Sequence, residues 1–243
     1  MLEGFKRLFT GGTTAPAKGW EGLAPWAESR QCSFRGVQDE GFVIDGRLGA
    51  TPWRLEWGPS QRPYIQGQEL RLRSELGLAS DLQVVLMNRV LQEQMEKDVF
   101  EQYVEGVQTR IDNQTPPEMR WLVMFPKLPG VDMGPLHENY VSLSSTKGWV
   151  QKWLRGPLMD ALAGLRVDPA TPLVLMIGRG RLMLRTAMVE PDVDGLQVWL
   201  RLFEVAMREA RRAADESSDT QSPSTHPSMW STSALPGDEH PTK

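Results

Sequence analysis

The chain of 243 residues is poor in the side chains that carry most enzyme and metal chemistry. It has one cysteine, Cys32, and three histidines, and two of these, His226 and His240, lie in a polar C-terminal stretch. His137 is the remaining histidine in the part expected to fold. A zinc site needs three or four clustered ligands, and no CxxC, HxxxH or HExxH spacing occurs. We therefore expect no metal.

Common catalytic signatures are missing as well. No GxSxG elbow, Walker-type phosphate loop or GxGxxG turn is present, so the usual hydrolase and nucleotide-binding classes are disfavoured. A thiol nucleophile would have to be Cys32 with His137 as its base, and free cysteines are more often inert. We predict no catalytic residues and no cofactor, although carboxylate chemistry stays open.

Long apolar runs are also absent. No stretch approaches the roughly 20 residues that span a bilayer, and the N-terminus lacks the features of a signal peptide. With 40% hydrophobic and 24% charged residues, the composition is that of an ordinary globular protein. A single thiol cannot form an intrachain disulfide, so we expect a cytoplasmic protein.

The net charge of −4 comes mostly from the C-terminal end. Residues 216–243 hold four carboxylates and one lysine, a net −3, which leaves −1 for the rest. Nucleic-acid binding depends on clustered positive charge, so we predict no nucleic-acid partner.

Composition divides the chain into four parts. Residues 1–19 form a short amphipathic turn and a Gly/Thr/Ala tether, and residues 216–243 are a Ser/Thr/Pro-rich tail expected to be disordered. Between them, Pro116 and Pro117 separate residues 20–115 from residues 118–215.

Both ends carry apolar residues that could bind something. Leu2, Phe5 and Phe9 share one side of the N-terminal turn, which could pack on its own domain, on a partner or on a membrane surface. Membrane binding is the less favoured reading, because so short a turn buries little area. Trp230 in the tail is either an isolated apolar residue or a short docking motif.

The two central parts have similar patterns. In the first, alternating residues predict strands over 33–37, 41–44, 53–57 and 69–75, then a strand or helix over 82–87 and a helix reaching Ile111. The second predicts strands over 121–125 and 140–143, a helix from Ser144 or Ser145 to Leu165 kinked at Gly156-Pro157, a hairpin over 173–185 and a helix over 195–214. These patterns predict an α+β fold of antiparallel strands followed by helices, as two similar halves packed into one body.

Residues 140–210 resemble bacterial domains of unknown function. The resemblance rests on the order of a serine-bearing strand from Tyr140, a helix ending near Leu158 to Leu165, a strand pair over 173–185, and Leu202-Phe203-Glu204. It implies neither an activity nor site residues.

Two groups of arginines could bind an anion. Arg54, Arg71 and Arg73, with Arg47 and Arg62, could line one sheet face, although neighbouring glutamates favour cross-strand ion pairs instead. Arg179 and Arg181 flank glycines in the predicted hairpin turn, which could hold an anion or be an ordinary turn.

Tryptophans and methionines are abundant, with nine and twelve residues. Most of their spacings are those of core positions, but indole and thioether groups also serve at interfaces. The function we favour is a non-enzymatic protein-interaction module. The alternatives are a small-molecule or anion-binding module, with or without carboxylate catalysis, and a peripheral membrane protein.

Overall fold

The structure is a computed structural model that describes residue 20 and residues 22–37, 41–104 and 115–219. The expectations for Leu2, Phe5, Phe9 and Trp230 therefore lie outside the described residues.

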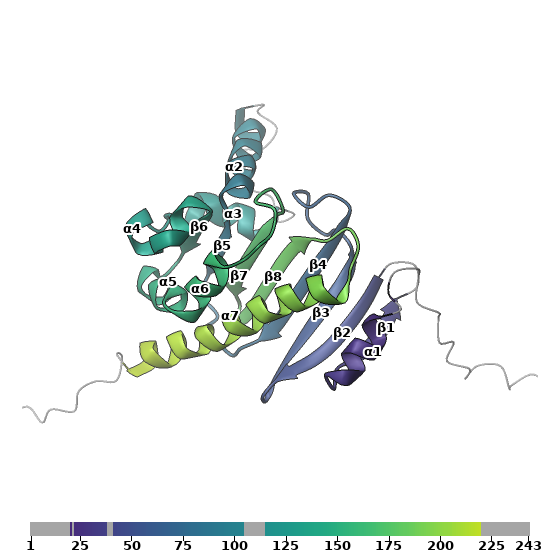
Figure 1. Cartoon of the computed structure of the whole chain (residues 1–243). Coiled ribbons are helices and arrows are strands. Elements are labelled where there is room, and N and C mark those ends of the chain that lie inside the picture. Colours follow the sequence, from purple (N-terminus) through teal and green to yellow (C-terminus); the bar gives the residue numbers. More distant parts are fainter. Residues whose placement is uncertain (1–19, 21, 38–40, 105–114, 220–243) are drawn as a thin grey trace, which may run out of the picture.

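One eight-stranded antiparallel sheet forms the centre of the molecule (Figure 1). Its strands lie in the order β1-β2-β3-β4-β8-β7-β5-β6. Their bounds are β1 Ser33–Val37, β2 Gly41–Leu48, β3 Thr51–Pro59, β4 Gln68–Glu75, β5 Val84–Asn88, β6 Tyr140–Ser144, β7 Leu173–Gly178 and β8 Arg181–Ala187. Because β5 lies between β7 and β6, the two sequence halves share one sheet.

Helices cover the two faces of this sheet unequally. The helices are α1 Leu23–Ser29, α2 Arg89–Val104, α3 Pro117–Met124, α4 Gly130–Met133, the 3-10 helix η1 Gly134–Glu138, α5 Lys147–Leu154, α6 Pro157–Ala163 and α7 Val193–Asp219. The larger hydrophobic core joins one face to α1, α5, α6 and α7, with α7 running across the strands (Figure 1). A smaller core joins part of the other face to α2 and α3.

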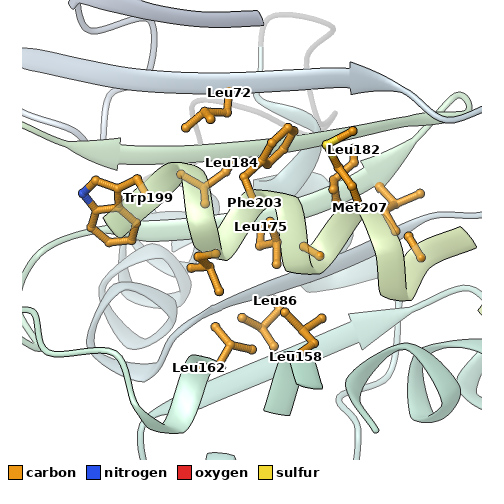
Figure 2. Packing of buried hydrophobic residues seen from close by; sticks show 14 of the residues in the cluster. Leu72, Leu86, Leu158, Leu162, Leu175, Leu182, Leu184, Trp199, Phe203 and Met207 are labelled. Atoms are coloured by element: carbon orange, nitrogen blue, oxygen red, sulfur yellow. The ribbon is translucent and has the colours of Figure 1, made fainter. Parts of the chain in front are cut away.

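The amphipathic pattern of α7 explains the larger core. Trp199, Phe203 and Met207 recur every four residues, so they fall on one side of the helix. Figure 2 shows these side chains directed at leucines of the sheet, including Leu184 and Leu175. Alternation along each strand puts these leucines on the same face, and burial of this face is the main source of stability.

Sequence reasoning identified most strands but misassigned the segment 121–125. The prediction of a strand there is wrong, because the structure has α3. Pro117 sits at the start of α3, where proline's missing N–H costs nothing, and Glu118, Trp121 and Leu122 then point to one buried side with helical spacing. A short apolar run does not distinguish a buried strand from a short helix.

Two further boundaries differ from expectation. The helix predicted from Ser144 or Ser145 to Leu165 is two helices, because Gly156 adopts φ +73° and ends α5 before Pro157 starts α6. The tail was expected from residue 216, but α7 continues to Asp219. Arg212 forms an ion pair with Glu216 at 2.5 Å, and Lys152 of α5 donates to the Glu216 carbonyl at 3.0 Å, so this last turn is tied to the body.

Truncation of the central residue of α7 should be costly. Phe203 has no exposed surface, so Phe203→Ala leaves a cavity between α7 and the sheet and should lower the free energy of unfolding by about 4 kcal/mol. Urea titration followed by circular dichroism measures the change. Val198→Ala is the matched control on the same helix, since Val198 is 40% exposed, and it should change stability by less than about 1 kcal/mol. Equal losses in both variants would contradict the assigned packing of α7.

Candidate functional site

The face opposite α7 is divided into an apolar half and a charged half. Over β7, β5 and β6 it carries the apolar residues of the smaller core, packed under α2 and α3. Over β1 to β4 and the adjoining part of β8 it carries charged residues, and no described helix packs on them. We call this charged part the open half-face.

The strand register determines which side chains are neighbours there. One row across the strands runs Arg35, Val43, Glu56, Arg71 and Arg185. The next row runs Ser33, Asp45, Arg54 and Arg73. Alternation along a strand points all of these side chains to the face opposite the larger core.

Arg54, Arg71 and Arg73, the arginines proposed from sequence for an anion site, do lie together on this face. Each is paired with a carboxylate, however. Arg54 donates to Asp45 through two nitrogens at 2.6 and 3.1 Å. Arg71 and Arg73 both reach Glu56, at 3.4 and 3.1 Å. These cross-strand pairs use much of the charge that an anion would need.

Arg179 and Arg181 lie apart from that group, in the turn between β7 and β8. Arg181 pairs with Glu75 across the strands. Arg179 has φ +53°, so the turn needs a left-handed residue at this position as well as at Gly180. The geometry is that of a tight hairpin turn, and Arg179 has no carboxylate within 4.0 Å among the described residues.

Sequence reasoning missed a buried ionic cluster where the two half-faces meet. Glu69 is fully buried, and its carboxylate accepts from Arg185 at 2.5 Å and from Arg71 at 3.4 Å. Glu118 of α3 is also fully buried, and it accepts from Arg62 and from the Tyr64 hydroxyl, the latter at 2.5 Å. The cluster therefore ties the loop between β3 and β4 to α3 and to the sheet.

Charge balance keeps this cluster in place. Burial raises the pKa of Tyr64 well above its ordinary value, and the Glu118 carboxylate adds to the rise, so the phenol stays protonated and donates. Burial acts to lower the pKa of Arg62, but Glu118 outweighs it and the net shift is upward. Glu118 Oε2 and Arg185 Nε are buried without a hydrogen-bond partner. A buried ion that loses its partner is costly, so these groups depend on one another.

The loop between β3 and β4 also borders a cavity of about 430 Å³ on the open half-face. Its lining includes Val43, Glu56 and Arg71 of the strands and Ser60 and Gln61 of the loop. A second cavity of about 350 Å³ lies where α2 begins, beside Asn88 and Arg166. Arg89, which also lines it, is held by the carbonyls of His137 and Glu138.

The candidates for nucleophilic chemistry are engaged locally. Burial raises the pKa of Cys32, which keeps the thiol protonated, and its Sγ is 3.5 Å from the Arg30 carbonyl. His137 Nδ1 lies 2.8 Å from the Gly134 carbonyl. In the described part of the chain, no three His, Cys, Asp or Glu side chains come together as metal ligands would.

Ser144 and Lys147 have the SxxK spacing of some serine hydrolases. Their side chains have separate partners: the Ser144 hydroxyl donates to the Thr146 carbonyl at 3.1 Å, and Lys147 pairs with Asp132 at 2.7 Å. Ser144 is also buried, so the spacing forms no accessible nucleophile.

Exposed apolar side chains concentrate on α2 and α3. Of eight large exposed apolar residues in the described ranges, four lie on these two helices, namely Val90, Phe100, Val123 and Met124. Phe100 and Met124 are 67% and 62% exposed. By contrast, Trp53, Trp149, Trp153 and Trp199 are buried, as their spacing indicated.

Comparisons with known proteins define no family. No protein-family model and no curated protein matches the chain. Among solved structures, it is similar to the crystal structure of the mycobacterial trehalose monomycolate transport factor A, TtfA, with a TM-score of 0.42 and 9% identity over 78% of this chain and 90% of that one. We attach no functional meaning to a likeness of this size. No helix in the described ranges is long and apolar enough to cross a membrane.

The sequence contained part of the signal for this site. Alternation along β3 and β4 placed the arginines on one face, but the contact between Arg62 and Glu118 joins residues 56 positions apart. The one sequence feature that singles out Glu118 is its position after two prolines at the start of an apolar helix. An exposed acidic residue is ordinary at that position, so the feature does not indicate burial. Burial of its carboxylate arises from the loop that folds over it.

Tyrosine ionisation should make the folded state sensitive to high pH. A raised pKa means that the folded protein holds its proton when the unfolded chain releases it, so stability is full below pH 10.0 and falls as pH rises above it. Chemical unfolding at a series of pH values measures this slope. Tyr64→Phe should reduce the slope. Tyr140→Phe is the comparison, since burial also raises the pKa of Tyr140 but no charged group contributes. An unchanged slope in Tyr64→Phe would contradict the buried cluster.

Proposed function

We propose that this protein is a non-enzymatic protein-interaction module, and that it binds another polypeptide on the side that carries the open half-face, α2 and α3. The carrying observation is the concentration of exposed apolar residues on α2 and α3. Exposed apolar side chains cost little when scattered, but a group of them on one side of a protein is typical of an interaction surface.

The distribution of polar groups supports the same proposal. Most of the charged residues on this side form ion pairs with one another, and the thiol and imidazole groups are engaged with their local backbone. An interface with an apolar centre and a polar rim needs this kind of surface, whereas catalysis needs a group held free in a cavity.

The alternatives from the sequence have less support. An anion-binding module would need several unpaired guanidinium groups close together, and Arg54, Arg71 and Arg73 all pair with carboxylates. Arg47 and Arg179 have no carboxylate within 4.0 Å among the described residues, but they lie on separate elements, in β2 and in the turn between β7 and β8. Membrane association would depend on residues 1–19. A cytoplasmic location is part of our proposal because Cys32 is a free thiol, a state that a reducing compartment preserves.

Affinity capture with matched variants tests the proposal. The double variant Phe100→Ser/Met124→Ser removes apolar surface from α2 and α3 and should lose the polypeptides that copurify with the tagged wild-type protein. Val131→Ser is the control, because Val131 is 88% exposed but lies on α4. It should retain the copurifying polypeptides. Thermal unfolding of all three proteins checks that each is folded. The same copurifying set for wild type and double variant would overturn the proposal.

A further inference from the structure

The open half-face has an excess of positive charge. Its arginines are Arg35, Arg47, Arg54, Arg71, Arg73, Arg181 and Arg185, and its carboxylates are Asp45, Glu56, Glu69 and Glu75. Seven cations against four anions give +3, on a chain whose net charge is −4. Arg35 and Arg47 are exposed and have no carboxylate within 4.0 Å in the described structure, so part of this excess faces solvent.

The helix next to it has the opposite sign. Between Arg89 and Glu101, α2 has four carboxylates and two cations, a net −2. Leu91 and Met95 fix the side of α2 that packs on the sheet. Helical periodicity then directs an exposed stripe away from the sheet. The stripe consists of Val90, Glu93, Lys97, Phe100 and Glu101.

We infer that a second copy of this chain covers the open half-face. In a two-fold dimer with the sheets face to face and the axis parallel to the strands, α3 and the first turns of α2 of each copy lie over the open half-face of the other, while the rest of α2 extends beyond the end of the sheet (Figure 1). These helical parts of both copies then form one layer between two sheets. Each copy offers one basic, uncovered half and one acidic, apolar-bearing half, so the surface is complementary to itself. This inference rests on the proposed function and names its partner.

The area of the surface favours an interface that combines the open half-face with the helices over one that uses the open half-face alone. Five strands about 4.8 Å apart, with side chains along about 25 Å of strand, give the open half-face roughly 500 Å². A stable interface buries about 800 Å² on each partner. The open half-face alone is therefore too small, but the two-fold contact uses it together with the exposed surface of α3 and of the first turns of α2.

The position of the cavity agrees with the same axis. Met87, Arg71 and Glu56 occupy one row across the sheet, and α2 begins two residues after Met87. The cavity that contains Glu56 and Arg71 is thus at the end of the sheet from which α2 leaves. An axis parallel to the strands keeps this end in common, so α2 of one copy comes next to the cavity of the other.

Sedimentation velocity of the purified full chain tests the dimer. The wild type should sediment as a dimer at about 100 µM and dissociate on dilution. Arg35→Glu reverses charge on the open half-face in the row nearest α2, and Glu93→Arg reverses it on the first turns of α2. Each variant alone should weaken self-association by at least about tenfold, because like charges then meet at both contacts. Val131→Ser should associate as the wild type does.

Mixing the two charge-reversal variants separates this geometry from other dimers. In the mixed pair, reversed α2 meets the reversed open half-face at one contact, and wild-type surfaces meet at the other, so heterodimers should form with near wild-type affinity. A monomeric wild type at about 100 µM, or a dimer insensitive to both variants, would overturn the inference. A monomer that still captures another polypeptide through Phe100 and Met124 would leave the proposed function standing. If the wild type is monomeric and captures no polypeptide through Phe100 and Met124, the proposed function is overturned as well.

Discussion

Uneven coverage of one central sheet is the constraint on which the rest of this structure depends. Antiparallel strands alternate their side chains between faces, so each face needs either a covering layer or side chains that tolerate water. The helices α1, α5, α6 and α7 cover one face, whereas α2 and α3 cover only the β7, β5 and β6 part of the other. The strands that lack this second cover carry arginines and carboxylates at the same alternating positions where the covered strands carry valine, leucine and methionine.

The buried ionic cluster lies at the boundary between the strands that helices cover and the strands that carry charged side chains. Among the described residues, Glu69 and Glu118 are the fully buried acids, and each is balanced by arginines from a different segment. Replacing such a cluster with apolar residues often costs nothing in stability. The cluster instead fixes the position of one loop, because the loop that carries Arg62 and Tyr64 is held against α3. That loop in turn lines part of the cavity on the open half-face.

This arrangement separates the charged and apolar parts of one surface, and our proposal of a recognition role rests on that separation. Glu118 and Tyr64 are paired with each other inside the cluster, while Phe100 and Met124 are exposed to solvent on the two helices beside it. A surface of this kind fits a partner with both characters. In the dimer that we infer, the second copy of the chain has both, in the reverse order across the two-fold axis.

The sequence by itself determined the α+β class, most strands and the apolar stripe of α7, because these depend on periodicities of two and of about four residues that act locally. It also placed Arg54, Arg71 and Arg73 on one face. It could not show that residues 117–124 form a helix, that β5 lies between β7 and β6, or that Glu118 meets Arg62. These features depend on contacts between distant segments. The assembled sheet likewise determines which strands α2 and α3 cover. The strands that they leave uncovered form the open half-face.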